Sequence, residues 1–477
     1  MKVLLVNAPP KVKQDTSGFE FLYPPLGVLY LASYARKVLD NTDFKFADGL
    51  LLGPDRTLDV VKQFRPDIVG VSYTTSACEG AYSFIEKVKS FSKGILVVSG
   101  GPHASVFFNE VMGRSKTDIC VLGEGELTFA EILQGNLLKD IDGIVYQEGD
   151  KTVKTPNRKS IRNLDDIPFP ARDLVEDWSV YKGFYLTKTK PDMTITSSRG
   201  CPYNCNFCSN PVWKLSKPVF RARSPENVVA ELRELKSKYG VKEIYDQTDD
   251  FNLSKKHALD LSQTIIDADL GLSFKFQARA NTMDEKLAEN IKKMGTWLVF
   301  IGAESGNQRT LDGVKKKIKV EDIENCAKLL STRGVKVYGL FMGFNIWEEE
   351  GKLCFEGVDE CRNTIKFSKH LVKKGYMHFM GFSLLTPFPG TEVFEIATRH
   401  NLFEKTEGWM RWNDLWKLNI KLPGVSDKDW HIVKGEAARA QAWCVLRSGN
   451  LNFKAINPLF RRAIQMVKFQ LEKLWPF

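Results

Sequence analysis

The chain has 477 residues, of which 43% are hydrophobic and 26% are charged, a composition typical of a soluble globular protein of about three domains. Its formal net charge of +10 favours anionic partners, but it has no basic tract or nucleic-acid-binding module, so we expect no nucleic-acid partner. No apolar run reaches the ~18 residues of a membrane-spanning helix, and the first residues, MKVLLVNAPP, do not form a secretory signal.

Residues 1–140 alternate apolar strands with amphipathic helices. This alternation is typical of the α/β class and predicts a Rossmann-like, doubly wound parallel sheet. Ligands of such sheets bind outside the carboxyl ends of the strands. The expected strands are Lys2–Val6, Phe44–Asp48, Asp67–Ser72, Ile95–Gly100 and Asp118–Leu122.

The turns after the last three of these strands are rich in glycine and small polar residues. They read SYTTS from Ser72, SGGPHAS from Ser99 and GEGE from Gly123. No GxGxxG or GxxxxGK[ST] loop follows the first strand, which argues against a nucleotide site there. A vestigial or nucleotide-binding Rossmann domain remains the alternative to a site for a different ligand.

Residues 141–190 predict a hairpin and a linker. The stretch GIVYQEGDKTVKT, from Gly143 to Thr155, predicts a hairpin that turns at Gly149 and Asp150. The proline-spaced stretch NLDDIPFPARDLV predicts the linker.

Residues 191–391 form a second series of alternating strands and helices. A serine cap at Ser224 and a glycine at Gly240 mark one of these helices well. The series predicts a partial, TIM-like (β/α)6 barrel, in which chemistry takes place at the carboxyl ends of the strands. The six strands are expected to begin near Met193, Val241, Leu272, Trp297, Val335 and Met377.

Residues 392–477 have a weaker pattern and predict a mainly helical C-terminal region on the substrate side. The segment Trp409–Trp416 is rich in tryptophan, and Leu459–Trp475 places apolar residues near one helical face with arginines and lysines among the polar positions. This last pattern predicts a surface helix that packs on the barrel. The alternative is a helix at a membrane surface, beside a lipid or tetrapyrrole substrate.

Three of the nine cysteines stand together in SSRGCPYNCNFCSN, directly after the first barrel strand. They are Cys201, Cys205 and Cys208, and the other six are scattered as in a reduced, cytoplasmic protein. Zinc needs a fourth ligand, but no second CxxC or HxxxH lies nearby. An iron–sulfur cluster fits better, because it is held by thiolates and three of them leave one iron open to an outside ligand.

The spacing CxxxCxxC, with the aromatic Phe207 before the last cysteine, resembles the radical S-adenosylmethionine superfamily. The resemblance implies that Cys201, Cys205 and Cys208 hold a catalytic [4Fe-4S] cluster whose open iron chelates S-adenosylmethionine. It also implies that Phe207, Asp249 or Asp250 in DDF, and Glu304 in IGAESG contribute to binding this cosubstrate. TPFPGT, from Thr386 to Thr391, resembles the turn that closes the barrel top.

The N-terminal region resembles the cobalamin-binding domain of a subfamily that pairs vitamin B12 with radical chemistry. The matching segments are Pro24–Arg36, Pro66–Ser72, Ser99–Ser105 and Gly123–Glu126. The histidine motif DxHxxG is missing after the first strand, so we expect base-off cobalamin without a histidine lower ligand. His103 is expected to contact the cofactor without ligating cobalt. The implied contacts are Ser72, Tyr73, Ser99, Gly100, Gly101, Pro102, His103, Gly123, Glu124, Gly125 and Glu126.

These resemblances imply a cobalamin-dependent radical enzyme that methylates an unactivated carbon of a small-molecule, lipid-like or tetrapyrrole-like substrate. The first alternative keeps both cofactors but closes or rearranges a ring without methyl transfer. The second is a B12 or iron–sulfur sensor without catalysis. The enzyme would also need a one-electron donor such as flavodoxin or ferredoxin, and we expect it in the cytoplasm, with peripheral membrane contact through the C-terminal helix as a variant.

Overall fold

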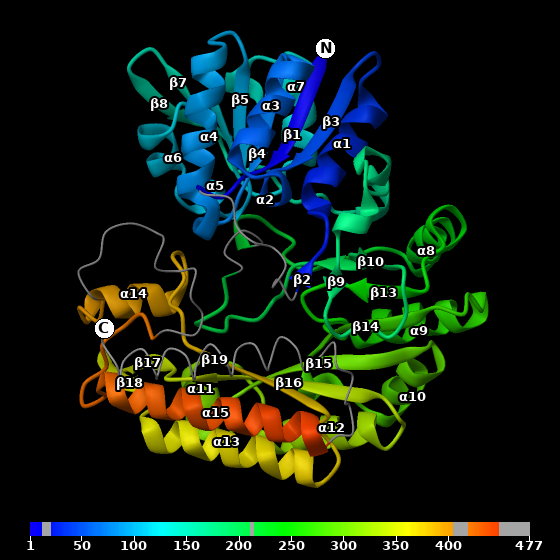
Figure 1. Ribbon diagram of the computed structural model, residues 1–477, viewed down its shortest axis with the longest axis vertical. Coiled ribbons are helices and arrows are strands. Elements are labelled where there is room, and N and C mark those ends of the chain that lie inside the picture. The colour runs from blue at the N-terminus through cyan, green and yellow to red at the C-terminus, as the bar shows by residue number, and fades with distance from the viewer. Residues whose placement is uncertain (12–20, 210–213, 404–417, 448–477) are drawn as a thin grey trace, which may run out of the picture.

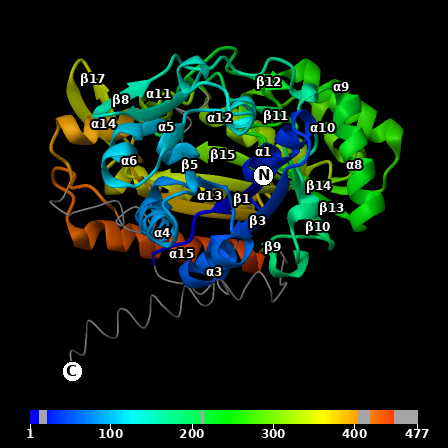
Figure 2. The ribbon, with the colours of Figure 1, turned by 90° about the horizontal axis from the view of Figure 1, so that it is seen from above.

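The computed structural model describes residues 1–11, 21–209, 214–403 and 418–447. Its elements form two α/β units that lie one above the other (Figure 1). In the view from above, the blue strands of the first unit lie over the green and yellow elements of the second (Figure 2). In Figure 1 the first strand runs from the N-terminus at the top toward the second unit, so the carboxyl ends of the parallel strands face that unit.

The first unit is built on a seven-stranded sheet in the order β3-β1-β4-β5-β6-β7-β8. Its first five strands are parallel, as expected from their apolar, β-branched sequences. The expected hairpin exists, but it extends this sheet through antiparallel pairing with β6 and is therefore part of the first unit. The strands are β1 (Lys2–Asn7), β3 (Asp43–Asp48), β4 (Ile68–Ser72), β5 (Leu96–Gly100), β6 (Ile119–Val121), β7 (Ile144–Glu148) and β8 (Lys151–Lys154).

Helices cover both faces of this sheet, so it is doubly wound as expected. Two helices pack on one face, in a core with Val3, Leu5 and Phe129, and the others pack on the opposite face around Leu4 and Val6. Those on the first face are α1 (Leu26–Val38) and α7 (Glu126–Leu133), and those on the second are α3 (Pro54–Phe64), α4 (Cys78–Phe91), α5 (Pro102–Val106) and α6 (Phe108–Arg114), with the short α2 (Gly49–Leu52) before α3.

The second unit is a partial barrel of six parallel strands in chain order, which confirms the predicted architecture. They are β10 (Asp192–Ile195), β13 (Glu243–Asp246), β14 (Ser273–Ala278), β15 (Thr296–Glu304), β16 (Lys336–Gly343) and β19 (Phe379–Leu384). The helices are α8 (Pro225–Tyr239), α9 (Lys255–Ala268), α10 (Glu285–Lys293), α11 (Gln308–Gly313), α12 (Val320–Ser331), α13 (Val358–Lys373) and α14 (Glu392–Arg399).

Three small antiparallel pairs join these sheets and were not expected from the sequence. The pair β11 (Ser198–Arg199) with β12 (Arg221–Ala222) lies at the two ends of the cysteine loop. One of the others pairs β2 (Phe21–Leu22), which precedes α1, with β9 (Gly183–Phe184) in the connection between the units. The last pairs β17 (Ile346–Glu349) with β18 (Lys352–Phe355).

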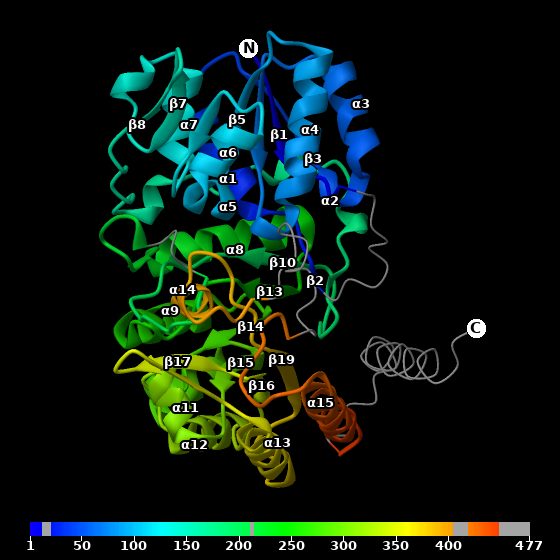
Figure 3. The ribbon, with the colours of Figure 1, turned by 90° about the vertical axis from the view of Figure 1, so that its left-hand side faces the viewer.

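The described part of the C-terminal region is helical, as expected. The helix α15 (Asp427–Arg447) lies along the outside of the barrel beside α13 (Figure 3). Trp430, Val433 and Cys444 on α15 are buried in the barrel core. The segments Trp409–Trp416 and Leu459–Trp475 lie outside the described residues. Within the described ranges, no helix combines enough length and apolar character to cross a bilayer.

Candidate functional site

A cavity of about 420 Å³ lies between the two units. On one side it is lined by the carboxyl ends of β4, β5 and β6 and by the turns that follow β5 and β6. On the other side it is lined by barrel residues near the cysteine loop, namely Thr196, Ser198, Arg199, Ser209, Gln247 and Asp249. A ligand in this cavity would therefore contact both units.

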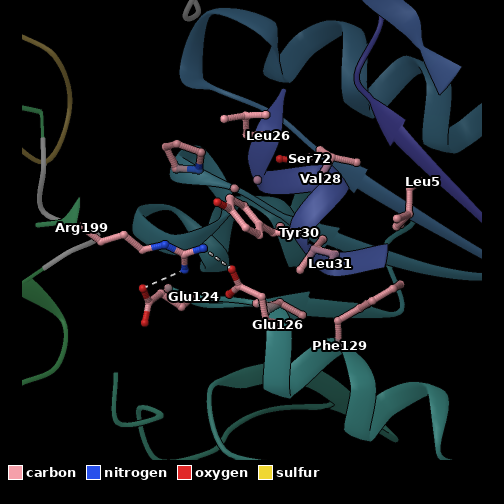
Figure 4. A pocket seen from close by; sticks show the side chains of 18 of the residues that line it. Leu5, Leu26, Val28, Tyr30, Leu31, Ser72, Glu124, Glu126, Phe129 and Arg199 are labelled. Carbon is pink, nitrogen blue, oxygen red and sulfur yellow. Dashed lines mark hydrogen bonds and ion pairs between the residues drawn. The ribbon is translucent and has the colours of Figure 1, made fainter. Parts of the chain in front are cut away.

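The part of the cavity inside the first unit is apolar. It runs between the sheet and the helices α1 and α7, and Figure 4 shows its side chains around the opening. Its walls include Leu5, Leu26, Val28, Leu31 and Phe129. Such a slot is suited to a flat, apolar group such as a heteroaromatic base.

Glycines keep the mouth of this slot open. A Cβ added at Gly27 would meet no atom within 4 Å, and at Gly100 or Gly123 the nearest atom would be 3.9 Å away. Gly101 is required for another reason, because its φ is +92° and a Cβ would lie 2.8 Å from the Ser72 hydroxyl oxygen. A cradle of backbone around an apolar slot fits a large planar cofactor such as a corrin with its nucleotide tail.

Most residues that we expected to contact cobalamin line this cavity, but Tyr73 and His103 do not. Both are buried in the first unit, where the Nε2 atom of His103 lies 2.9 Å from the Tyr82 hydroxyl and its Nδ1 lies 3.2 Å from the Thr75 hydroxyl. Burial lowers the pKa of His103 to about 4. The neutral imidazole is thus a hydrogen-bonded core residue, and this placement does not favour contact with the cofactor. The expected residues that do line the cavity are Ser72, Ser99, Gly100, Gly101, Pro102, Gly123, Glu124, Gly125 and Glu126.

The two glutamates of GEGE also line the cavity, but their carboxylates are already paired. Glu126 lies 2.7 Å from the Arg199 guanidinium, and Glu124 lies 3.1 Å from Arg199 and 2.7 Å from Arg221. Figure 4 shows Arg199 reaching from the barrel to both carboxylates. Burial opposes ionisation of Glu124, but the two arginines outweigh it and lower the pKa of that carboxyl.

The cysteine loop starts at the carboxyl edge of the barrel, where the sequence analysis placed it. Cys201, Cys205 and Cys208 are each partly exposed and unbridged. Asn206 anchors the loop, because its side chain donates to the carbonyl of Ile346 (2.9 Å) and its own carbonyl accepts from the amide of Val393 (3.1 Å). The donor set of three thiols in one short loop fits an iron–sulfur cluster.

The three thiols do not converge in the structure: within the described ranges, no three His, Cys, Asp or Glu side chains are close enough to hold a metal ion. Burial, together with the carboxylates of Asp250 and Asp249, raises the pKa of Cys201 to about 11. A bound cation would reverse this preference, since metal coordination deprotonates a thiol.

A group of charged side chains lies behind the cysteine loop. Glu304 pairs with the buried Lys316 at 2.8 Å, and Lys316 lies 5.9 Å from the centre of the Phe207 ring. Burial opposes the charge of Lys316, but Glu304, Cys205 and Asp250 outweigh it and raise its pKa. Burial raises the pKa of Asp250 to about 6 in spite of Lys316 and Arg279. The group therefore brings two acidic side chains and a buried lysine close to one another.

The backbone around this group is specialised. Glu304 has a φ of 59°, which is rare for a residue other than glycine, and it lies where the register of β15 and β16 shifts. The carboxylate of Asp249 accepts a hydrogen bond from the amide of Gly200 at 3.0 Å, so it supports the start of the cysteine loop. The two adjacent aspartates therefore have different surroundings. Asp249 supports the loop and lines the interdomain cavity, whereas Asp250 faces the charged group.

Four residues at this site were not identified from the sequence: Arg199, Arg221, Arg279 and Lys316. Arg279 stacks on Tyr203 of the cysteine loop, with 3.4 Å between the guanidinium carbon and the ring centre. Lys316 follows the matched GAESG segment by ten residues in an ordinary-looking run of lysines, so only its burial identifies it. Arg199 and Arg221 are partners of glutamates that lie far away along the chain.

Comparisons with known proteins cover both units. Residues 195–352 match the model of the Radical SAM superfamily, and residues 16–133 match the B12 binding domain. The chain is 36% identical over 430 residues to "Uncharacterized methyltransferase PH0819" of Pyrococcus horikoshii, with 87% of each chain covered. It is 27% identical over 422 residues to the anaerobic magnesium-protoporphyrin IX monomethyl ester cyclase of Rubrivivax gelatinosus, which covers 85% of this chain and 71% of the cyclase.

Among solved structures, the chain is similar to the cobalamin-dependent S-adenosylmethionine radical enzyme OxsB with aqua-cobalamin and S-adenosylmethionine bound. The TM-score is 0.71 at 18% identity, and the match covers 92% of this chain and 66% of OxsB. At this identity the likeness concerns the fold, and it extends over both α/β units.

Proposed function

This chain belongs to the B12-binding radical S-adenosylmethionine enzymes, and we propose that it transfers a methyl group to an unactivated carbon of a small-molecule substrate. The observation that carries the proposal is the single cavity lined by the carboxyl edge of the B12-binding sheet and by barrel residues beside the cysteine loop. A radical formed on the barrel side and a methyl donor held on the sheet side would meet in one place. The relative from Pyrococcus horikoshii, 36% identical to this chain, is also called a methyltransferase.

When bound, the cluster would supply the electron that cleaves S-adenosylmethionine to a 5′-deoxyadenosyl radical, and cobalamin would carry the methyl group. The thiols of Cys201, Cys205 and Cys208 would hold the cluster as thiolates. Phe207 would contribute the apolar wall between the loop and the barrel core, against which it packs.

The charged group behind the loop would bind the amino acid part of S-adenosylmethionine. Asp250 and Glu304 would accept hydrogen bonds from the ammonium group, and Lys316 would pair with the carboxylate. Lys316 already neutralises Glu304 at 2.8 Å, so the group can stay charged while buried. Asp249 would not contact the cosubstrate; its carboxylate would accept the hydrogen bond from the amide of Gly200 and so hold the start of the cysteine loop.

Cobalamin would be bound mainly through the complementary shape of the cavity. The glycine-lined mouth would admit the corrin, and the apolar slot beside α1 and α7 would admit the base of its nucleotide tail. The first histidine of the chain is His103, and both of its ring nitrogens lie within hydrogen-bond distance of hydroxyl groups. Cobalt would therefore lack a histidine ligand from the loop after the first strand.

The reaction also needs partners that lie outside the chain. A one-electron donor of the flavodoxin or ferredoxin type would reduce the cluster, as in any reductive cleavage of S-adenosylmethionine. The protein would work in the cytoplasm. A substrate of lipid or tetrapyrrole type, with the helix that the sequence predicts at Leu459–Trp475 placed at a membrane surface, is an alternative and more specific form of the proposal.

The similarity to the magnesium-protoporphyrin IX monomethyl ester cyclase favours a second candidate, ring formation without methyl transfer. Both candidates use the same cofactors, so the products must distinguish them. A methyltransferase converts one S-adenosylmethionine to S-adenosylhomocysteine for each methyl transferred, whereas a cyclase has no need to form this product.

The test is anaerobic reconstitution with iron, sulfide and hydroxocobalamin, followed by reduction with titanium(III) citrate and addition of S-adenosylmethionine. We expect both S-adenosylhomocysteine and 5′-deoxyadenosine, each measured by mass spectrometry. Formation of 5′-deoxyadenosine alone would overturn methyl transfer in favour of the cyclase candidate. Formation of neither product, by protein that holds both cofactors, would favour a sensor.

A further inference from the structure

We infer that Glu124 and Glu126 are positioning residues that hold the base of the cysteine loop through Arg199 and Arg221, so that the cobalamin site and the cluster site influence each other's affinity. This inference rests on the proposed function, because it concerns the same two cofactors. It adds a second role to the expectation that the two glutamates contact cobalamin, because their carboxylates are paired with cations from the barrel.

The geometry at the base of the loop supports this role. Arg199 and Arg221 face each other in the antiparallel pair of β11 and β12. β11 ends two residues before Cys201, and β12 lies beyond Cys208, so the pair closes the loop that carries the three thiols. Gly200 makes the closure tight, since its φ is +85° and a Cβ there would lie 1.8 Å from the carbonyl oxygen of Val219.

The first unit contacts both strands of this pair with the same short segment. Glu124 binds Arg199 at 3.1 Å and Arg221 at 2.7 Å, and Glu126 binds Arg199 at 2.7 Å. All four side chains are at most 10% exposed. Arg199 also lies 5.0 Å from the ring centre of Tyr30, which lines the same cavity.

Because these four charged side chains are buried, each needs its partner to compensate its charge. A buried carboxylate or guanidinium that loses its partner keeps a charge without compensation, so the network favours one relative placement of the two segments. Water screens the pairs little, because each side chain is largely shielded from solvent. The loop base and the GEGE segment should therefore move together.

Both glutamates and Arg199 line the cavity that would hold cobalamin. A cofactor in that cavity touches the network directly, and the network is continuous with the loop that would hold the cluster. Coupling between two binding sites is reciprocal, so a cluster in the loop should change the affinity for cobalamin by the same factor as the reverse. This can be measured without knowing the substrate.

The experiment measures the Kd of hydroxocobalamin by equilibrium dialysis, for wild-type protein with the cluster reconstituted and for the same protein kept free of iron. We expect the cluster-loaded protein to bind at least about fivefold more tightly, which is the lower end of typical coupling between sites. In Arg199→Gln this ratio should fall to about one. Arg199→Lys should restore part of the difference in affinity, because lysine returns the positive charge but cannot bind two carboxylates in the bidentate geometry of arginine.

Two further variants guard against trivial results. Glu126→Gln removes one ion pair and keeps the shape of the side chain, so it should lower the ratio even if Arg199→Gln fails to fold. Arg362→Gln is the matched control, because Arg362 pairs with Glu436 at 3.0 Å between α13 and α15, where the barrel faces away from the cavity. It should keep the wild-type ratio. Iron content and circular dichroism are measured for each protein.

A ratio of one in the wild type, or an unchanged ratio in both Arg199→Gln and Glu126→Gln, would overturn the inference and leave the proposed function standing. Wild-type protein that binds no cobalamin or takes up no iron would overturn the proposed function, and the inference with it. The two failures are therefore distinguishable from the wild-type measurements alone.

Discussion

The two halves of the site are built by different means. On the barrel side, three thiols and a few charged groups are concentrated in one loop and the strand ends behind it. On the sheet side, the cavity is formed by glycines and apolar side chains, and its two carboxylates are paired with arginines from the barrel. The first half would bind through a small number of strong contacts, and the second through shape.

This difference implies a difference in tolerance to mutation. A site with few strong contacts fails when one of them is removed. A site that binds through shape weakens by degrees, because each substitution changes only a part of the contact area. The predictions below test this contrast, from the largest expected effect to the smallest.

The largest effect is expected at a thiol. Cys205→Ser should abolish cluster incorporation and lower the rate of 5′-deoxyadenosine formation by more than about 100-fold, because even partners of metal ligands are worth about 10- to 100-fold. The check is iron content and product formation after reconstitution. Cys354→Ser, at a partly exposed cysteine of β18, is the control and should behave as wild type. Full iron content in Cys205→Ser would remove this thiol from the cluster site.

The next effect is expected at the buried cation of the barrel. Lys316→Gln should raise the Kd of S-adenosylmethionine about 30-fold, since a charge-assisted hydrogen bond contributes about 2 kcal/mol. The affinity is measured by isothermal titration calorimetry of the cluster-loaded protein with S-adenosylmethionine. Lys315→Gln is the matched control, because Lys315 is adjacent to Lys316 in the chain but is half-exposed and pairs with Glu392 on the surface. Equal affinities for the two variants would contradict the role of Lys316.

A third effect concerns the core of the first unit and its dependence on pH. The pKa of His103 falls from 6.5 to about 4 on burial, so the unfolded chain binds a proton at this residue before the folded protein does. The stabilisation is present above pH 6.5 and is lost as the pH falls toward 4. From pH 7.5 to 5.5 this residue should cost about 1.4 kcal/mol of unfolding free energy.

The measurement is urea unfolding at both pH values for wild type and His103→Gln, which keeps a side chain able to form hydrogen bonds. The wild type should lose about 1.4 kcal/mol more than the variant over this range. Equal losses would mean that His103 is not a neutral core residue. Cobalamin affinity should change little in this variant, unlike in a variant of the cavity wall.

The smallest effect is expected from filling the cradle. Gly27→Leu should weaken cobalamin binding by about fivefold, because overpacking a well-formed cavity costs about 1 kcal/mol. It should also stabilise the protein slightly, since leucine is a better helix former than glycine. Gly113→Leu is the control: Gly113 is exposed on α6 and does not line the cavity, so the affinity should not change. Unchanged affinity in Gly27→Leu would argue against this cavity as the cobalamin site.

The contrast between the halves also explains what could be predicted from the sequence. The cysteine loop was identifiable because its ligands are neighbours in the chain, and the parallel strands because each is a short apolar run. The pairing of Glu124 with Arg199 and Arg221 was not identifiable, because 75 and 97 positions separate the partners. Without the arginines, GEGE was interpreted as a cofactor-binding segment alone.

Contacts between distant segments also explain what was missed for the hairpin and for His103. The strands β7 and β8 were recognised, but their pairing with β6 depends on a contact between segments that only the fold brings together. His103 follows a glycine-rich turn at the carboxyl end of a strand, which is where ligand-binding residues are common. The short helix α5 instead turns its side chain into the core, toward Tyr82.

The central claim is that cobalamin and the cluster face one cavity, and electron paramagnetic resonance tests it most directly. Protein loaded with both cofactors is reduced so that cob(II)alamin and the reduced cluster coexist, and their signals are compared with those of samples that hold only one. We expect a spin–spin interaction that broadens or splits both signals. A spectrum that equals the sum of the two single-cofactor spectra would contradict the shared cavity.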